Sequence, residues 1–141
     1  MTDRVEIDPE KGCTDTAMAA WWCVFCAIVE GRAPATVVRE WADALAIRPR
    51  RPIVEGHVLV LPRVHVQDVG VDPGVSAAAM TAAAELAGEL DACNVITSRG
   101  AVATQTVWHL HLHVVPRAAD DGLALPWTER QRREGTQHEQ R

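Results

Sequence analysis

Three histidines, His109, His111 and His113, alternate with apolar residues in the last third of the chain. Because successive side chains of a β-strand point to opposite faces, a strand here would place the imidazoles on one face and Leu110 and Leu112 in the core. The outer two imidazoles would stand about 13 Å apart, at roughly 3.3 Å per residue, and could not easily bind one metal ion through bonds of about 2 Å. The spacing therefore predicts different roles for the three histidines. A hairpin strand with a solvated polar face is the alternative, although Thr, Lys and Glu are more common on such a face.

His111, in the middle of the three, is the candidate nucleophile. A neutral imidazole can attack phosphorus directly, and water can then release the group from the resulting phosphoramidate. Gln105 and Thr106, just upstream, could donate hydrogen bonds to phosphate oxygens without adding charge, and His113 could be a further donor. On spacing alone, ordinary loop-to-strand chemistry is the better explanation for Gln105 and Thr106.

Cys23 and Cys26 form a CxxC pair, a spacing that redox motifs and zinc sites have in common. A redox motif would lie between a strand and a helix of a βαβ unit, and the surrounding pattern does not predict one. A zinc site needs further nitrogen or sulfur ligands, and His65, just past a predicted strand, or His109 could complete a tetrahedral site. From the residues alone, both interpretations remain open.

Several short elements must position these residues. Apolar side chains on both faces of residues 57–61 predict a central strand. Asp72 and Pro73 predict the N-cap and first residue of an alanine-rich helix. The predicted elements, joined by hairpin-length connections, are helices over 14–22 and 75–92 and strands over 35–41, 44–47, 57–61, 94–97 and 107–115. This pattern is typical of an antiparallel α+β domain.

The chain has 141 residues and a net charge of −5, which suits a single domain and argues against an extended nucleic-acid surface. It contains no apolar run long enough to span a bilayer and no signal-peptide pattern, so we expect a cytoplasmic protein without a membrane partner. In that compartment the four cysteines should be thiols or metal ligands. We expect an N-terminal arm over residues 1–20, a folded domain over 21–127 and a charged tail over 128–141.

The segment Gln105–Arg117, with the sequence QTVWHLHLHVVPR, resembles the signature of the histidine triad (HIT) superfamily. The segments CVFCAI (residues 23–28), GHVLVLPRVH (56–65) and Asn94–Ala103 occur in the order and spacing of that family. The resemblance covers roughly residues 21–117. It is highly specific because it joins several separate motifs.

The resemblance implies a HIT-like fold, in which a five-stranded antiparallel sheet with one long and one short helix usually pairs into a homodimer. It also implies a nucleotidyl hydrolase or transferase that acts on phosphoramidates, dinucleoside polyphosphates or similar nucleotides. In the family pattern His111 is the nucleophile that accepts the nucleotidyl group, and His57 supports the histidine network. The residues implied to bind phosphate or nucleotide are His113, Gln105, Thr106 and Ser98, and the implied ligands of a structural Zn²⁺ ion, one per chain, are Cys23, Cys26, His65 and His109.

Three positions depart from the family pattern. Many relatives have a ribose-binding aspartate where this chain has Pro49, several have an asparagine at Ser98, and a glycine is common at Thr104. Proline offers no side-chain acceptor, so ribose recognition must differ or be weak. Pro49 lies in a run with Arg48, Arg50 and Arg51, which is most simply a solvated edge, although arginine suits bidentate phosphate contacts.

Two other functions compete with the nucleotidyl hydrolase. A metal-dependent hydrolase would use the histidine cluster as catalytic ligands, and its turnover would be sensitive to chelators while the fold stayed intact. A zinc-stabilised nucleotide-binding or adaptor homodimer with little turnover would bind nucleotide without releasing product. Pro49 and Ser98 favour this last alternative.

Overall fold

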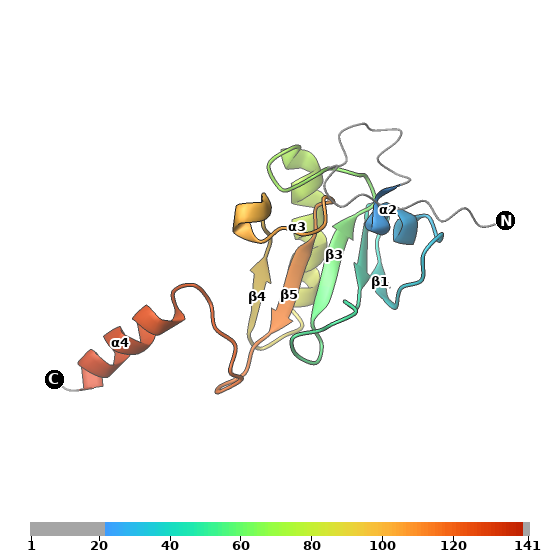
Figure 1. Cartoon of the computed structure of the whole chain (residues 1–141). Helices are drawn as coiled ribbons and strands as arrows, with labels where there is room; N and C mark the ends of the chain where they lie inside the picture. The colour runs from blue at the N-terminus through green and yellow to red at the C-terminus, as the bar shows by residue number, and fades with distance from the viewer. Residues whose placement is uncertain (1–21, 140–141) are drawn as a thin grey trace.

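The computed structural model describes residues 22–139. The arm predicted over residues 1–20 lies outside the described residues, as does the helix predicted over 14–22 except for Trp22. The described elements, in chain order (Figure 1), are α2 (Val24–Val29), β1 (Val37–Glu40), β2 (Ala44–Ile47), β3 (Val58–Pro62), α3 (Pro73–Ala87), β4 (Cys93–Ile96), the 3-10 helix η1 (Ala101–Ala103), β5 (Leu112–Pro116) and α4 (Thr128–Glu139).

The five strands form one antiparallel sheet in the order β1-β2-β3-β5-β4. Val60 of β3 pairs with Ala46 of β2 on one side and with Leu112 of β5 on the other. β3 is therefore the central strand, as its two apolar faces predicted. The α+β class and the five-stranded antiparallel sheet are confirmed.

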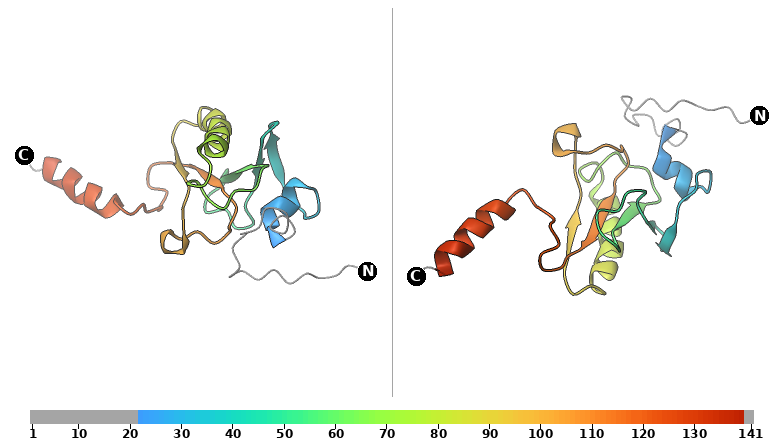
Figure 2. Two further views of the ribbon diagram at one scale, coloured as in Figure 1. Left: turned by 90° about the horizontal axis from the view of Figure 1, so that it is seen from above. Right: turned by 60° about the horizontal axis from the view of Figure 1, so that its bottom comes forward.

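The sheet separates two apolar clusters, because alternate residues of β3 point to opposite faces. On one face Val58 and Val60 pack with α3, whose buried alanines allow it to lie close to the sheet. On the other face Leu59 and Leu61 pack with α2 through Phe25. The ribbon views agree, with α3 on one side of the sheet and α2 on the other (Figures 1 and 2). Both faces of the central strand are therefore covered.

The helix α3 begins where the sequence predicts but ends earlier. The Asp72 carboxylate accepts hydrogen bonds from the backbone N–H groups two and three residues further on, and Pro73 is the first helical residue, as expected for an N-cap followed by proline. The helix ends at Ala87 instead of near residue 92. Gly88 follows, and because glycine costs about 1 kcal/mol relative to alanine inside a helix, the chain turns here toward β4.

The strand predicted over residues 107–115 is shorter in the structure. β5 begins only at Leu112, so the first two histidines of the triplet precede it. The segment before β5 bonds elsewhere: the N–H of Leu110 donates to the carbonyl of Val66 at 2.8 Å. The predicted alternation nevertheless holds, since Leu110 and Leu112 lie in the cluster beneath α3 and the histidines lie on the α2 side.

Beyond β5 the chain leaves the sheet and forms α4, which projects away from the other described elements (Figure 1). Its charged side chains pair within the helix, as in Arg130 with Glu134 at 2.9 Å and Arg133 with Glu129 at 2.7 Å. The tail predicted over residues 128–141 is thus helical where it is described. Among the described helices, none is both long and apolar enough to cross a bilayer.

Candidate active site and metal centre

His111 is held through its ring and its backbone. Its Nδ1 lies 2.8 Å from the carbonyl oxygen of His109, and because a carbonyl only accepts, Nδ1 carries the proton and donates it. The hydroxyl of Thr97, just after β4, donates to the His111 carbonyl at 2.8 Å. The Phe25 ring meets the imidazole edge-on, with 5.2 Å between ring centroids. In the neutral ring the lone pair is therefore on Nε2.

Burial keeps this group of imidazoles neutral. It lowers the pKa of His111, against the hydrogen bond to the His109 carbonyl, which favours the charged form. Burial also lowers the pKa of His57. The pKa of His113 falls to about 4, because of burial and the charges that His111 and His57 would carry if protonated. Near neutral pH the three rings therefore act as uncharged donors and acceptors.

His57 and His113 form a hydrogen-bonded pair in which each proton has a defined place. The backbone N–H of Ile53 donates to His57 Nδ1 at 3.3 Å, so the neutral His57 ring carries its proton on Nε2. That Nε2 donates to His113 Nδ1 at 2.9 Å, which leaves the His113 proton on its own Nε2. The pair therefore offers an N–H donor on a ring whose centroid lies 5.2 Å from that of His111.

Gln105 braces the loop between η1 and β5. Its buried side-chain amide donates to the carbonyls of Gln67 and Val107 at 2.8 and 3.0 Å, and its side-chain oxygen accepts from the N–H of Gly100 at 2.9 Å. Both amide protons are therefore bound by backbone carbonyls in this structure. The side chain therefore shapes the loop that carries Thr106, another candidate phosphate contact.

Two hydroxyl groups proposed to contact phosphate lie near this loop. Thr106 is exposed and Ser98 is half-buried just after β4, and neither side chain has a hydrogen-bond partner among the described residues. Thr104, where the family pattern has glycine, adopts a left-handed φ of 73°. Thr104 therefore adopts a backbone angle that glycine would adopt easily but that strains a β-branched residue.

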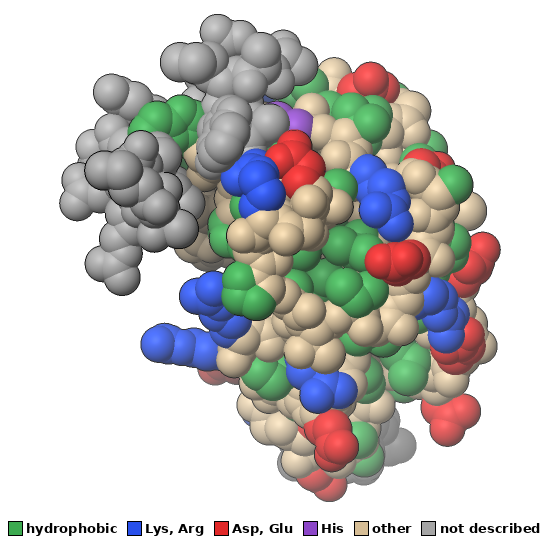
Figure 3. All heavy atoms as spheres, turned by 90° about the vertical axis from the view of Figure 1, so that its right-hand side faces the viewer, with side chains coloured by type: hydrophobic (Ala, Val, Ile, Leu, Met, Phe, Trp, Pro, Cys, Tyr) green, Lys and Arg blue, Asp and Glu red, His purple; other side chains and the backbone are tan. Residues whose placement is uncertain are grey.

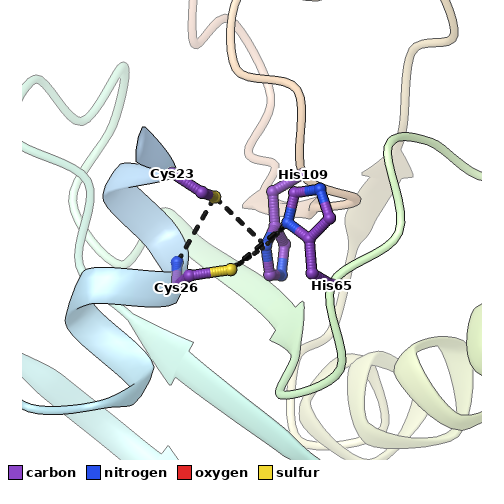
Figure 4. Close-up of side chains that lie close together, drawn as sticks. All are labelled: Cys23, Cys26, His65 and His109. Atoms are coloured by element: carbon purple, nitrogen blue, oxygen red, sulfur yellow. Dashed lines mark hydrogen bonds between the residues drawn. The ribbon is translucent and has the colours of Figure 1, made fainter. Parts of the chain in front are cut away.

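Four residues from three segments converge at the start of α2 (Figure 4), and their donor atoms all lie within 4.8 Å of one another: Cys23, Cys26, His65 and His109. The Cys26 Sγ lies 3.2 Å from His65 Nδ1 and 3.5 Å from His109 Nδ1, and the two Nδ1 atoms are 3.1 Å apart. His109 Nε2 donates to the carbonyl of Pro62 at 2.9 Å. The Nδ1 lone pair of neutral His109 therefore points into the cluster.

These separations fit a tetrahedral zinc ion. Bonds of about 2.3 Å to sulfur and about 2.0–2.1 Å to nitrogen give N···S edges of about 3.5 Å and N···N edges of about 3.3 Å. Zinc binds the thiolate form, and hydrogen bonding with Cys26, together with that from His109 and His65, lowers the pKa of Cys23. The residues present therefore suit a Cys2His2 zinc site, which favours the zinc interpretation of the CxxC pair over the redox one.

A cavity of about 710 Å³ is lined by residues of α2, of β2 and of β3, and it includes Phe25, whose ring also contacts His111. One wall is apolar and includes Phe25 and Leu59, the second of which pairs with His113 in the sheet. The other wall is formed by the segments 34–36 and 48–50, where Thr36 carries a hydroxyl and Pro49 offers no side-chain hydrogen-bonding group. On the side of the molecule that carries α2 and β1, basic and acidic side chains border apolar surface (Figure 3). The volume suits a small-molecule ligand.

Comparisons with known proteins agree with this architecture. Residues 30–120 match the family model described as the HIT domain. The chain is 41% identical over 110 residues to a HIT-like protein of Mycobacterium tuberculosis, covering 73% of this chain and 76% of that protein. It is 32% identical over 108 residues to an Arabidopsis thaliana protein named as an adenylylsulfatase, covering 72% of this chain and 55% of that protein. A zinc-bound histidine triad family protein from Mycobacterium smegmatis has a similar crystal structure, with a TM-score of 0.66, 41% identity, and coverage of 75% of this chain and 82% of that chain.

The sheet, the histidine triplet and these matches define the histidine triad class of proteins. The chain belongs to the HIT family, in which a solved relative is described as a hydrolase. The resemblance inferred from the sequence motifs and the HIT-like fold are both confirmed. The zinc-bound relative also agrees with the Cys2His2 cluster found here.

The sequence motifs did not single out the groups that hold the histidines in place. Ile53 and Pro62 act through backbone atoms, and backbone atoms carry no residue-type signal. Thr97 acts through its hydroxyl, but its partner is also a backbone carbonyl. Phe25 lies inside the CxxC motif and is the single phenylalanine of the chain. It was the one supporting residue that the sequence could have indicated.

Proposed function

We propose that the protein is a nucleotidyl hydrolase or transferase that cleaves phosphoramidate or phosphoanhydride bonds of nucleotides through a covalent nucleotidyl-His111 intermediate. The observation that carries the proposal is the tautomer of His111. Its Nδ1–H is bound to the His109 carbonyl at 2.8 Å, so the Nε2 lone pair is available for attack. The HIT-family relative described as a hydrolase and the Arabidopsis relative named as an adenylylsulfatase support the same class of reaction.

The reaction proceeds in two displacements at the α-phosphorus. First, the His111 Nε2 lone pair bonds to phosphorus while the bond to the leaving nitrogen or oxygen breaks, and the leaving group takes that electron pair. Next, a water oxygen bonds to phosphorus and the bond to Nε2 breaks, which returns the pair to the ring. Water supplies the new hydroxyl of the nucleoside monophosphate and the proton of the leaving group. The hydrogen bond to the His109 carbonyl stabilises the charge on the ring while phosphorus is attached.

Donors for the phosphate oxygens come from both sides of His111. The link from His57 leaves a proton on His113 Nε2, and we assign this N–H to a phosphate oxygen. The Thr106 and Ser98 hydroxyls are further donors. Gln105 acts mainly by holding the loop in shape. Neutral N–H and O–H donors of this kind stabilise a phosphate and do not protonate the attacking Nε2 of His111.

We also propose that the Cys2His2 cluster binds one Zn²⁺ per chain in a structural role. All four donors are protein side chains, so a tetrahedral ion has no open position of the kind that a catalytic zinc uses for water or substrate. When bound, the ion crosslinks the start of α2, the segment after β3 and His109. Its contribution is to hold the His109 carbonyl, and through it the ring of His111, in place.

The remaining expectations are proposals that rest on the family resemblance and on composition. They are a homodimer, a cytoplasmic location, and the division of the chain into a domain over 21–127 and a tail over 128–141. The nucleotide substrate is the one small-molecule partner proposed.

A zinc-stabilised nucleotide-binding protein with little turnover is the second candidate, and one observation favours it. Pro49 lines the cavity at the family position of the ribose-binding aspartate, so an ordinary ribose meets no acceptor there. Looser positioning of the substrate would lower turnover. The metal-dependent hydrolase is disfavoured, because its ligand set would need an open coordination position.

The decisive experiment measures nucleoside monophosphate release by mass spectrometry from a panel of nucleoside phosphoramidates and dinucleoside polyphosphates, with wild type beside His111→Ala. We expect release by the wild type and a loss of at least about 1000-fold in the variant, as for removal of a covalent nucleophile. Circular dichroism of the variant controls for folding. Full turnover by folded His111→Ala would rule out the covalent mechanism, and tight nucleotide binding without release would favour the binding protein.

A further inference from the structure

One side chain contacts both the cavity and the candidate nucleophile, His111. Phe25 lines the cavity and also contacts the His111 ring edge-on at 5.2 Å. Val107 lines the cavity as well and lies four residues before His111. A substrate that reacts at His111 therefore has the cavity beside it to receive the part of the nucleotide that is not the leaving group.

The charge of this cavity comes from one short segment. Among the described residues that line it, Arg48 and Arg50 are charged and none carries a carboxylate. Both arginines are exposed, and neither side chain has an ion-pair partner among the described residues. The backbone N–H of Arg48 donates to the carbonyl of Thr36 at 2.9 Å, and Pro49 restricts the backbone between them. The segment is thus anchored while its two guanidinium groups remain able to bind a ligand.

This wall has the wrong chemistry for an unmodified ribose. Ribose hydroxyls are recognised well by a carboxylate, which accepts two hydrogen bonds, whereas proline accepts none through its side chain and guanidinium groups only donate. The one side-chain acceptor among the described lining residues is the hydroxyl of Thr36. Donors with positive charge suit an anion, and the planar fork of arginine matches phosphate geometry. The apolar wall formed by Phe25, Ile47 and Leu59 still suits the flat face of a base.

We propose that the cavity binds a nucleotide whose sugar carries a second phosphate, at its 2′ or 3′ position, with that phosphate between Arg48 and Arg50. The inference deepens the proposed function and rests on it in one respect, because it places the reacting 5′-phosphate at His111. Under this proposal Arg48 and Arg50 select the substrate and are not merely part of a solvated edge.

Binding is tested first, without any need for turnover. Calorimetry on the full wild-type chain would compare nucleoside 5′-monophosphates with the 2′,5′- and 3′,5′-bisphosphates, in an adenosine and a guanosine series. The 5′-diphosphates serve as controls that carry the added charge elsewhere. We expect one bisphosphate to bind at least about tenfold more tightly than both the monophosphate and the 5′-diphosphate. The preferred isomer shows whether the 2′ or the 3′ position is recognised.

Variants then locate the preference. Arg48→Ala and Arg50→Ala should each reduce the ratio of bisphosphate to monophosphate affinity by about tenfold. Arg51→Ala is the matched control, since it removes the same charge one residue further on but Arg51 does not line the cavity; the ratio should be kept. Equal affinities, absence of binding in both series, or an equal effect of all three variants would overturn the inference.

Turnover separates this inference from the proposed function. The 5′-phosphoramidates of the same nucleosides, with and without the sugar phosphate and with one common amine, would be assayed for release. Preferential binding without release of any product would support the sugar-phosphate site and overturn the proposed hydrolase. Release with no preference in binding or in kcat/KM would support the hydrolase and overturn the sugar-phosphate site.

Discussion

At the scale of single residues, the site is defined by where protons lie. The carbonyl of His109 can only accept a hydrogen bond and the N–H of Ile53 can only donate one. The first places the proton of His111 on Nδ1. The second, through His57, places the proton of His113 on Nε2. Two backbone groups thus give the same type of side chain two different roles, a free Nε2 lone pair on His111 and an N–H donor on His113.

Burial of these imidazoles predicts a dependence of stability on pH. The pKa of His113 is lowered to about 4 from its ordinary value of 6.5, so between these values the unfolded chain binds more protons than the folded one. The free energy of unfolding is therefore retained above about pH 6.5 and falls as the pH drops toward 4. We expect His113→Gln to lose less stability than the wild type between about pH 7.5 and about pH 5. Urea unfolding checks this, with zinc content measured in each sample, and equal losses would contradict it.

The loop that precedes the histidines stores strain at Thr104, whose φ is 73°. The left-handed conformation costs a β-branched residue about 1–2 kcal/mol, of which the greater unfolded-state freedom of glycine offsets about 0.5–1 kcal/mol. Thr104→Gly should therefore raise the free energy of unfolding by about 0.5–1 kcal/mol. Denaturant unfolding measures it, and a decrease would be the contrary result.

Gly100 provides the opposite substitution as a control. Its φ is 92°, and a Cβ there would meet nothing within 4 Å, so Gly100→Ala changes the backbone preference without a clash. A loss of about 1–3 kcal/mol is expected. Opposite signs at these two positions would show that backbone conformation contributes to the stability of the loop, beside the hydrogen bonds of the Gln105 side chain.

At the scale of elements, the sequence predicts those features of helices and strands that depend on residues close together in the chain. The Asp72–Pro73 cap and the central strand predicted over residues 57–61 are encoded within a few residues, and the structure confirms both, with β3 at Val58–Pro62. The start of β5 depends on the hydrogen bond from Leu110 to Val66, which no periodicity encodes. The metal donors and the histidine triplet could be named from the motifs because residue type carries their chemistry. Their supporting backbone partners could not.

The hydrogen bond from Thr97, just after β4, to the candidate nucleophile His111 gives a further prediction. Thr97→Val removes the hydroxyl that donates to the His111 carbonyl at 2.8 Å and keeps the shape of the side chain. We expect a loss of about 1 kcal/mol in stability and a decrease of about fivefold in kcat with little change in KM, because a displaced nucleophile affects the chemical step. Steady-state kinetics measures both parameters.

Thr81→Val is the matched control for this prediction. It removes a hydroxyl bond of the same length, from Thr81 to the Ala77 carbonyl within α3, on the side of the sheet away from the histidines. Its kcat should equal that of the wild type. Equal kcat for both variants would mean that Thr97 does not position His111.

The zinc ion proposed to crosslink the start of α2 predicts that zinc removal strongly lowers thermal stability. One equivalent of zinc per chain should be found by atomic emission, and at a free concentration 1000 times its Kd the ion would stabilise the fold by about 4 kcal/mol. A chelator should therefore lower the Tm of the wild type. Cys26→Ser should bind little zinc and respond weakly to the chelator, whereas Cys93→Ser, outside the cluster, should respond as the wild type does. Unchanged thermal stability of metal-free wild type would contradict a structural role.

At the scale of the whole molecule, the sheet separates two functions. The α3 side is an apolar core, whereas the α2 side carries the Cys2His2 cluster, the histidines of the candidate active site and the cavity. Central β3 belongs to both sides, with Val58 and Val60 on one and Leu59 and Leu61 on the other. Neighbouring β2 does the same, with Ala44 and Ala46 on one side and Leu45 and Ile47 on the other, so the core and the site share the central strands of the sheet.

The C-terminal helix is expected to be dispensable for this arrangement. The ion pairs described in α4 join residues of α4 to one another, and such exposed pairs contribute about 0.3–0.5 kcal/mol each. A chain ending at Trp127 should unfold within about 0.5 kcal/mol of the full chain and keep its turnover. Urea unfolding, kinetics and size-exclusion chromatography check this. A marked loss of stability or a change of oligomeric state would show that α4 packs against the domain or a second chain.

The two charged residues that line the cavity, Arg48 and Arg50, flank Pro49, whereas the histidine triplet and the candidate metal donors lie elsewhere in the chain. Nucleotide changes in three neighbouring codons could therefore alter which sugar is accepted, while the codons for the reacting histidines stayed unchanged. If the proposed sugar-phosphate site is correct, substrate preference could change by mutation of this segment without first passing through an inactive protein.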